Sequence, residues 1–371
     1  MKYYLIAGEA SGDLHGAALM EALAQCDSSA TFRFWGGELM AAQGGELVRD
    51  YRDAAVMGFV EVLRKAGSLR RNLAFCKADI ELWRPDAVIL IDYPGFNLRI
   101  AESASRKGFK VFWYIAPKVW ASRERRVRKL RKYVDRLFVI LPFEQEYYRK
   151  HGIDAVYVGN PLVDAVAGSD TSRDGLPDKP YIALLPGSRK SEISYTMPVF
   201  MKLEKLLAEA GLKDFGLVIA AAPSLGDEQY EAYMSGSAAK LVRGQTHSVL
   251  RHSAAAVVDS GTASLEAALL GAPQVVVYGM NALTFMLVRL MLKTKYVSLV
   301  NIISGRKVVG ELLQENCRAD KILEVLRPLL EDSPSRSAML EDYAKLKEAL
   351  GEGGASLRAA QEMATALKSS N

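Results

Sequence analysis

Short apolar runs alternate with helical patterns twice along this chain of 371 residues, which predicts an α/β protein built from two Rossmann-like, doubly wound domains. The first series of runs ends at Val158, a polar stretch rich in Gly, Asp and Pro occupies 168–180, and a second series starts at Tyr181. The chain is also longer than the size at which a single hydrophobic core usually stops growing. We therefore expect two domains that face each other across a cleft.

The expected boundaries follow from these breaks. The first domain spans 1–167, the linker 168–180 and the second domain 181–350, and residues 351–371 form a final helix that packs back on the first domain. Each apolar run is short and bounded by turn residues, as buried parallel strands are. The predicted strands are Tyr3–Ala7, Phe32–Trp35, Ala87–Ile91, Val111–Ile115, Arg136–Ile140 and Ala155–Val158, then Tyr181–Leu185, Leu217–Ala221, Lys240–Val242, Ala254–Val258 and Gln274–Tyr278.

Ligands of open parallel sheets bind at the carboxyl ends of the strands, so the turns there are the candidate sites. The most informative turn follows Ala254–Val258 and opens a helix that Gly271 and Pro273 are expected to end. A helix that begins at the end of a strand offers unpaired N–H groups and partial positive charge. This stretch therefore predicts an anion site.

The residues at the start of that helix suit a nucleotide diphosphate. Gly261 allows a phosphate to approach the backbone, and Ser260 and Thr262 add hydroxyl donors. The alternative is a simple helix cap. A capping box requires its acidic residue three positions after the cap, which leaves Glu266 unexplained, and its carboxylate can instead accept hydrogen bonds from two sugar hydroxyls.

A second turn of this kind opens the second domain, where Pro186 is followed by Gly187, Ser188 and Arg189. A guanidinium can make paired hydrogen bonds to phosphate oxygens, and the serine adds a hydroxyl. Two such turns in one domain can converge on one diphosphate. Asn301 follows another apolar segment, where a polar ligand contact and a turn role are both open.

The turns of the first domain carry carboxylates instead. Gly8–Asp13 lacks the GxGxxG pattern of dinucleotide-binding turns, and Glu9 and Asp13 would repel a pyrophosphate, so this turn suits a polyhydroxylated ligand. After Ala87–Ile91, Asp92 precedes a tight Pro-Gly turn. A carboxylate there can act as a general base on a hydroxyl, although a plain turn-forming role is equally open.

The distribution of charged and apolar residues predicts a partner that is both anionic and hydrophobic. The stretch 106–136 contains twelve Lys or Arg and only two acidic residues, Glu124 and Asp135. Two interpretations are open: a solvated helix face, or a binding site for phosphate, anionic lipid or nucleic acid. Residues 56–75 form an apolar stripe with a basic flank, which suits a membrane surface or packing on the protein's own core. The stripe contains Phe59, Val62, Leu63, Ala66, Leu69 and Leu73.

Other classes are disfavoured. The three cysteines and four histidines form no metal-binding spacing, so no metal site is predicted. No apolar run has the length of a membrane span, and the run at Tyr3–Ala7 is too short for a signal peptide, so a cytoplasmic location is expected. The basic run matches no nucleic-acid-binding motif, so no nucleic-acid partner is expected.

The chain resembles the lipid-A-disaccharide synthase family in six motifs that occur in order up to about residue 315. The resemblance implies an inverting, metal- and cofactor-independent glycosyltransferase of the GT-B fold that joins UDP-2,3-diacylglucosamine to 2,3-diacylglucosamine 1-phosphate. The products would be a β-1,6-linked disaccharide and UDP. The motifs are Ala-Gly-Glu-Ala-Ser-Gly-Asp at 7–13, Val-Met-Gly-Phe-Val-Glu-Val at 56–62, Ile-Asp-Tyr-Pro-Gly-Phe-Asn at 91–97, Ala-Pro-Lys-Val-Trp-Ala at 116–121, Leu-Pro-Gly-Ser-Arg at 185–189 and Ser-Gly-Thr-Ala-Ser-Leu-Glu at 260–266.

The resemblance also implies roles and a location. Asp92 would be the catalytic base, with Glu9 and Asp13 beside it and Arg189 on the phosphate side. The enzyme would work at the anionic inner face of the cytoplasmic membrane, with acyl-chain contacts along the 56–75 stripe. The resemblance is also compatible with a homodimer. The acceptor-side turns would contribute Ser11, Gly12, His15 and Asn97, and UDP would contact Gly187, Ser188, Arg189, Ser260, Gly261, Thr262, Glu266 and Asn301.

Three positions depart from the family pattern, and two alternatives remain. His15, Lys118 and Ser122 stand where an aliphatic residue, a serine and a tryptophan are familiar. A UDP-GlcNAc 2-epimerase or another UDP-sugar glycosyltransferase of the same fold would have a similar second domain. A non-catalytic lipid or nucleotide binder at a membrane surface would need neither Asp92 nor Arg189.

Overall fold

The computed structural model describes residues 1–54, 61–279 and 294–369. The chain divides into two compact units, Met1–Pro161 with Glu352–Asn371, and Leu162–Gly351. Helix α8 (Pro161–Ala167) therefore belongs almost entirely to the second unit, although the polar stretch that suggested a linker begins only after it.

The first unit is built on a seven-stranded parallel sheet in the order β3-β2-β1-β4-β5-β6-β7. Strand β1 lies between β2 and β4, so the strand order reverses between β1 and β4. The strands are β1 (Lys2–Ala7), β2 (Thr31–Gly36), β3 (Glu46–Asp50), β4 (Ala87–Ile91), β5 (Lys110–Tyr114), β6 (Arg136–Val139) and β7 (Ala155–Tyr157).

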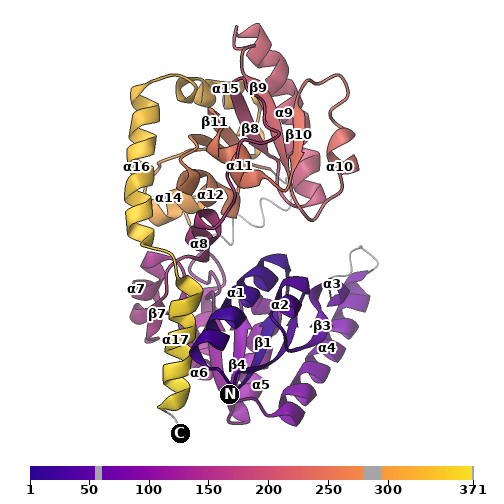
Figure 1. Ribbon diagram of the computed structural model, residues 1–371, viewed down its shortest axis with the longest axis vertical. Coiled ribbons are helices and arrows are strands. Elements are labelled where there is room, and N and C mark those ends of the chain that lie inside the picture. Colours follow the sequence, from indigo (N-terminus) through magenta and orange to yellow (C-terminus); the bar gives the residue numbers. More distant parts are fainter. Residues whose placement is uncertain (55–60, 280–293, 370–371) are drawn as a thin grey trace. The chain divides into compact units, whose positions relative to one another are not determined.

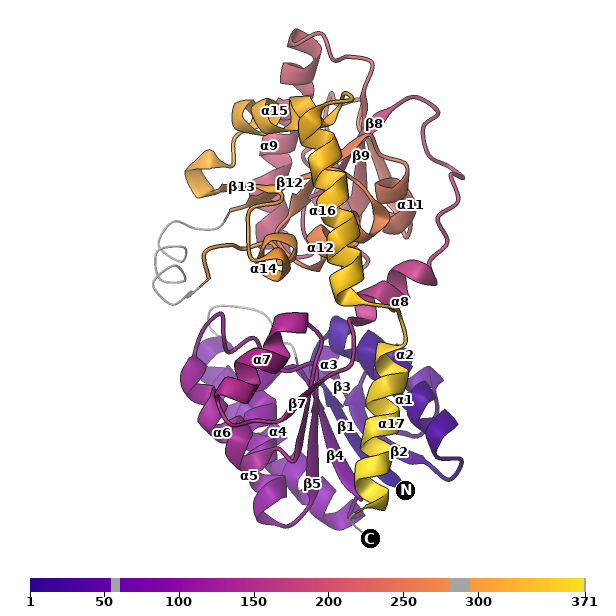
Figure 2. The same ribbon diagram turned by 90° about the vertical axis from the view of Figure 1, so that its left-hand side faces the viewer.

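Helices cover both faces of this sheet and produce two cores. One face packs against α4 and α5, and the other against α1 and the C-terminal helix α17, whose Ala360, Met363 and Leu367 are buried there. Figures 1 and 2 show α17 lying along this unit. The helices are α1 (Ala10–Cys26), α2 (Glu38–Ala42), α3 (Tyr51–Ala54), α4 (Glu61–Trp83), α5 (Pro94–Arg106), α6 (Val127–Tyr133), α7 (Pro142–Lys150) and α17 (Ala355–Lys368), with a 3-10 turn at Glu124–Arg126.

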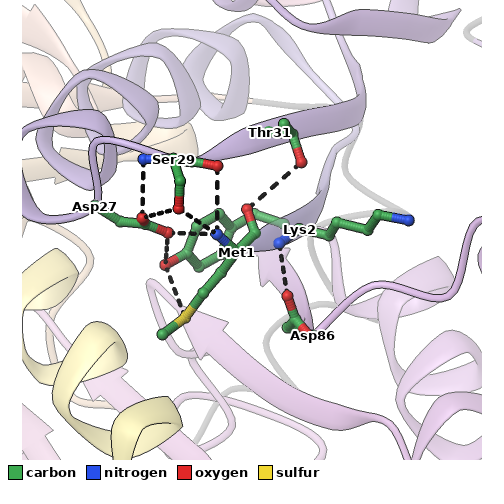
Figure 3. Close-up of polar contacts among 7 residues, drawn as sticks. Met1, Lys2, Asp27, Ser29, Thr31 and Asp86 are labelled. Carbon is green, nitrogen blue, oxygen red and sulfur yellow. Dashed lines mark hydrogen bonds and ion pairs between the residues drawn. The ribbon is translucent and has the colours of Figure 1, made fainter.

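Polar contacts attach the start of β1 to the loops around it (Figure 3). The ammonium group of Met1 lies 2.7 Å from Asp27 Oδ2, and the backbone N–H of Lys2 donates to Asp86 Oδ2 at 2.7 Å. Thr31 N donates to the carbonyl of Met1 at 2.9 Å. These bonds hold the amino end of β1. The turn that follows its carboxyl end belongs to the candidate site described below.

The second unit repeats this plan with a six-stranded parallel sheet in the order β10-β9-β8-β11-β12-β13. Its strand order reverses between β8 and β11. The strands are β8 (Tyr181–Leu185), β9 (Gly216–Ala221), β10 (Lys240–Arg243), β11 (Ala255–Asp259), β12 (Gln274–Tyr278) and β13 (Gly310–Leu313). The helices are α9 (Lys190–Glu209), α10 (Glu228–Glu231), α11 (Thr246–Arg251), α12 (Thr262–Leu270), α14 (Leu299–Ser304), α15 (Ala319–Leu326) and α16 (Pro334–Leu350), with 3-10 turns at Gln314–Asn316 and Arg327–Leu329.

The two parallel sheets confirm the predicted α/β class, and α12 ends as expected, at Gly271 with a φ of 78°. The edge strands β3 and β13 were not predicted. Each pairs with one neighbour only and remains partly exposed, so its sequence lacks the continuous apolar run that marks the buried strands.

Candidate active site

In the first unit, the turns after β1 and β4 meet at the point where the strand order reverses, where doubly wound sheets bind their ligands. A Cβ atom on Gly8 would collide with the ring of Tyr93. The absence of a side chain at Gly8 therefore lets the Asp92–Asn97 turn pack directly on the Gly8–Asp13 turn. The structure brings Glu9 and Asp92, two residues predicted from separate motifs, into one site.

The backbone at Asp92 is held in a rare conformation. Asp92 and Tyr93 have φ values of 40° and 44°, in the left-handed region that side chains other than glycine disfavour. Such residues cost about 1–3 kcal/mol each and persist only where their surroundings enforce them. Here Asp92 N donates to the Tyr114 carbonyl at 3.2 Å, and Asn97 Nδ2 donates to the Asp92 carbonyl at 2.9 Å. The strained backbone lowers the stability of the fold and fixes the orientation of Asp92.

The carboxyl group of Asp92 has the protonation behaviour that a general base needs. Burial, with a smaller contribution from the nearby Glu9 carboxylate, raises its pKa to about 6 against the opposing effect of Lys118. A base whose pKa lies just below neutral pH is ionised yet still has appreciable affinity for a proton. Asp92 can therefore accept a proton from a substrate hydroxyl.

The first turn supplies two further polar groups. Glu9 is exposed and accepts a hydrogen bond from Ser11 Oγ at 2.7 Å. Burial lowers the pKa of His15 to about 4, with Glu9 acting in the opposite direction. His15 is therefore neutral at physiological pH and suits a hydrogen bond to a substrate better than base catalysis.

Asp13, which the sequence predicts to be catalytic, binds the start of a neighbouring helix. Its carboxylate is buried and accepts backbone hydrogen bonds from Gly37 at 2.7 Å and from Leu39 and Met40 at 3.1 Å. These bonds satisfy the N–H groups at the start of α2, as a helix cap does. Gly12 is likewise buried, packed against Ala7.

Asn97 supports the site from behind instead of facing an acceptor. The side chain is fully buried, and its Nδ2 lies within hydrogen-bond distance of the carbonyls of Asp92, Ile91 and Ile6. It joins the ends of β1 and β4 below the turn. Asn97, predicted to lie in the acceptor-side turn, therefore supports the Asp92 backbone.

Glu144 belongs to this site and was missed from the sequence. Its carboxylate accepts from Trp120 Nε1 at 2.8 Å and from the N–H groups of Leu141 and Ile140 at 3.0 and 3.3 Å. Burial raises its pKa to about 7, and Lys118 lowers it, as it does for Asp92. Glu144 therefore anchors the 116–121 motif. In the sequence it looks like an ordinary acidic residue in the first turn of a helix.

The proposed apolar stripe is only partly described. Phe59 and the side chains of Val62 and Leu63 lie outside the described part of the chain. Leu73 is buried in the core of the first unit and Leu69 packs against that core, so these two follow the alternative of packing inward. Phe75 on the same helix is 45% exposed, with Arg49 over its ring. Within the described segments, no helix combines the length and apolar composition needed to cross a membrane.

In the second unit, the turns after β8 and β11 occupy the equivalent place at the reversal of strand order. Gly187 has a φ of 104°, which favours glycine, and the Glu192 side chain lies against it. The Glu192 carboxylate accepts the N–H groups of Ser188 and Arg189 at 2.8 and 3.1 Å, and its other oxygen accepts from Arg189 Nη1 at 2.7 Å. Glu192 thus holds the turn, while 74% of the Arg189 side chain remains exposed.

The turn after β11 has the openness that an anion site needs. Gly261 and Thr262 are exposed, and a Cβ atom on Gly261 would meet no protein atom within 4 Å among the residues described. Helix α12 begins at Thr262, so its amino-terminal N–H groups lie in this turn. Ser260 Oγ donates to the Val297 carbonyl at 3.3 Å, which attaches the turn to the segment before α14.

Glu266 faces a histidine that the sequence did not single out. Its carboxylate lies 4.0 Å from His247 Nε2 at the start of α11, and both side chains are mostly buried. Burial raises the pKa of Glu266 and lowers that of His247. No motif links the two positions, so only the packing of α11 on α12 reveals the pair.

The amide of Asn301, a predicted UDP contact, is engaged with other groups of the second unit. The side chain is fully buried, its Oδ1 accepts the N–H groups of Val308 and Val309, and its Nδ2 donates to the Val309 carbonyl and to Glu311. Both lone pairs and both amide hydrogens are therefore used by groups of the chain itself. Of the two roles left open by the sequence, the structure supports the turn role.

No group of His, Cys, Asp and Glu side chains in the described ranges is arranged to hold a metal ion. Exposed arginines and lysines of the first unit lie along the 3-10 turn at Glu124–Arg126 and along α6, among them Arg125, Arg128 and Lys132.

The sequence is similar to known proteins over nearly its whole length. Residues 3–365 match a family model described as lipid-A-disaccharide synthetase. The lipid-A-disaccharide synthase of Myxococcus xanthus is 41% identical over 367 residues, covering 97% of this chain and 96% of that protein. That of Syntrophus aciditrophicus is 39% identical over 381 residues, covering 99% and 98%.

Solved structures share the fold at much lower identity. S. aureus MnaA with UDP has a TM-score of 0.68 at 14% identity and covers 99% of this chain and 97% of that one. The UDP-GlcNAc 2-epimerase of Methanocaldococcus jannaschii, with UDP-GlcNAc and UDP, has a TM-score of 0.65 at 13% identity and covers 98% and 100%. These similarities confirm the GT-B fold class.

Proposed function

The chain belongs to the lipid-A-disaccharide synthase family, and we propose that this glycosyltransferase joins UDP-2,3-diacylglucosamine to 2,3-diacylglucosamine 1-phosphate. The proposed products are the β-1,6-linked disaccharide 1-phosphate and UDP. The observation that carries the proposal is Asp92, a carboxyl group with a raised pKa, held by a strained backbone where the strand order reverses.

Asp92 is the proposed general base. It removes the proton of the acceptor's 6-hydroxyl group, whose oxygen then forms a bond to the anomeric carbon of the donor. The bond from that carbon to the diphosphate breaks, and UDP leaves from the opposite face, which inverts the configuration. Glu9, Ser11 and His15 are the proposed contacts to the sugar hydroxyls of the acceptor, since Glu9 acts on Asp92 and the other two act on or bond to Glu9.

The second unit is proposed to bind the donor. The departing diphosphate gains negative charge in the transition state, and Arg189, Ser188 and the amino terminus of α12 are suited to stabilise it. Glu266 is the proposed ligand of the ribose hydroxyls, supported by a carboxylate that makes only a distant contact to His247 among the described residues.

The lipid parts of the substrates are proposed to reach the enzyme at an anionic membrane surface, the inner face of the cytoplasmic membrane. The exposed cations of the 3-10 turn at Glu124–Arg126 and of α6 support this, because clustered Lys and Arg attract anionic headgroups and phosphate. Binding to vesicles containing anionic phospholipid tests it, with neutral vesicles as the control. Equal binding to both would contradict an electrostatic role.

Formation of the disaccharide from the two diacyl sugars tests the function directly. Wild-type protein should release one UDP for each disaccharide, and both Asp92→Asn and Arg189→Ala should slow turnover strongly. Unchanged turnover in both variants would remove the mechanism. Conversion of UDP-GlcNAc to its 2-epimer, without disaccharide formation, would favour the epimerase alternative instead.

A further inference from the structure

Asp259, the last residue of β11, is a buried carboxyl group at the donor turns that no step above uses. It is 5% exposed, and its Oδ1 has no hydrogen-bond partner among the described residues. Burial, with a smaller contribution from the Glu192 carboxylate, raises its pKa to about 8 against the opposing effects of the Ser260 N–H and Arg189. At neutral pH this carboxyl group therefore carries a proton.

Asp259 and Glu192 lie beneath the same turn. A Cβ atom on Gly187 would lie 2.7 Å from Glu192 Oε2 and 3.1 Å from Asp259 Oδ2. The two oxygens are therefore within about 6 Å of each other, a separation at which one carboxylate disfavours ionisation of the next. Glu192 is engaged with Arg189, so the proton resides on Asp259.

The groups around this pair come from several elements. Arg189 is the cation that acts on Asp259, while Tyr278 at the end of β12 and Cys317 after the 3-10 turn at Gln314–Asn316 both feel its charge. Burial raises the pKa of Tyr278, and burial raises that of Cys317 to about 11. Both are neutral near pH 8, so Asp259 is the neighbour of Glu192 that titrates there.

We propose that Asp259 and Glu192 are a positioning pair for the donor diphosphate, which share one proton so that the turn they support carries a single negative charge. Glu192 holds the N–H groups of Ser188 and Arg189 and orients the guanidinium. The proton on Asp259 allows this without a second anion below the phosphates. The inference rests on the proposed function, in which Arg189 binds the diphosphate of a UDP-sugar.

The sign of the pH effect follows from charge. A bound diphosphate favours the protonated pair, so UDP affinity falls as the pH rises and Asp259 loses its proton. In Asp259→Asn the amide reproduces the neutral form at every pH. We therefore expect the variant to bind UDP like the wild type near pH 7 and more tightly than the wild type near pH 9.

Isothermal titration calorimetry with UDP measures this. From about pH 7 to about pH 9, the wild-type dissociation constant should rise about tenfold, and that of Asp259→Asn should change by less than about twofold. Titration of UDP itself affects both proteins equally. Asp320→Asn, which removes an exposed carboxylate of the same unit, is the matched control and should keep the wild-type profile.

Kinetics separate positioning from a structural role. The donor KM of the wild type should rise over this pH range while kcat stays level, and Asp259→Asn should lack the rise. Glu192→Gln, which keeps an acceptor oxygen but loses the charge, should also flatten the profile. A wild-type affinity that does not fall with pH, or an Asp259→Asn profile that still falls, would overturn the inference.

A measurement on the unaltered protein covers the case in which a variant fails to fold. Titration near pH 8.5 in two buffers of different ionisation enthalpy should show that UDP binding takes up protons, and the absence of uptake would contradict the shared proton. Failure of the wild type to bind UDP at any pH would instead contradict the proposed function. The two failures are therefore distinguishable.

Discussion

The two units place a carboxyl group at the same point of the same topology but expose it differently. Asp92 follows β4 and Asp259 ends β11, each on the strand that pairs with the first strand of its sheet. Burial and a second carboxylate together raise the two pKa values, to about 6 and about 8, and in each case one cation opposes the rise. The environments differ in the turn that follows.

That turn decides which chemistry each carboxyl group can perform. After β4 the chain enters two left-handed residues, and Asp92 stays partly exposed. After β11 the chain leaves in an extended conformation, and Asp259 is buried under Gly187. The comparison teaches that the doubly wound sheet supplies the position of an acidic group, while a few loop residues decide whether it meets a substrate or supports a binding turn.

The largest effect should come from Asp92→Asn, which tests whether the exposed carboxyl group is the base. Removing a general base costs about a thousandfold in kcat. The melting temperature should hardly change, because the amide keeps the shape of the side chain. Asp154→Asn, at a side chain 91% exposed in the same unit, serves as the control and should retain full activity. Turnover by Asp92→Asn within about tenfold of wild type would break the comparison.

The next effect concerns the cation of the second unit. Arg189→Ala should lower kcat/KM for the donor about a hundredfold, because the guanidinium stabilises the departing diphosphate. Arg189→Lys should recover only part of this loss, since an ammonium cannot bind phosphate in the same paired geometry. Steady-state kinetics with the donor varied provide the measurement. Equal rates for the alanine variant and the wild type would show that Arg189 does not contact the phosphates.

Asp13→Ala should affect stability more than chemistry, in contrast to Asp92→Asn. It removes three backbone hydrogen bonds at the start of α2 and should lower the free energy of unfolding by about 1–3 kcal/mol. Denaturant unfolding measures the loss. The folded fraction should keep most of its kcat, and a deep loss of kcat with unchanged stability would restore Asp13 to a catalytic role.

The smallest effect is a shift of a pH profile. Asp92 must be ionised to act as a base, so log kcat/KM should rise with pH and level off above a pKa of about 6. Lys118 favours the ionised form, so in Lys118→Met the midpoint should move to higher pH, while the rate on the plateau near pH 8 should change little. A midpoint that stays in place would mean that Lys118 does not act on Asp92.

The turns of the proposed donor site could be located from the sequence, because their signals are local. The apolar run before Ser260, the glycine and hydroxyl residues of the turn, and Gly271 and Pro273 at the end of α12 are all read within one strand, turn and helix. The Pro186–Arg189 turn can be predicted from the sequence for the same reason. Helix propensities, glycine conformations and hydrophobic periodicity act over a few residues, so they are visible in the linear chain.

The side chains whose roles were misjudged or missed depend on partners far along the chain. Asp13 meets the backbone at Gly37, Glu144 meets Trp120, and Asp259 meets Glu192. A polar residue at the end of a strand has the same appearance in the sequence whether its hydrogen bonds are free or used.

The sequence by itself therefore determined the fold class, the turns that border the strand ends and the family. Only the tertiary structure decided which carboxyl groups in those turns remain available and at what pKa. The physical reason is that hydrogen-bond satisfaction and desolvation depend on every group that packing brings near, and those groups are set by the whole fold.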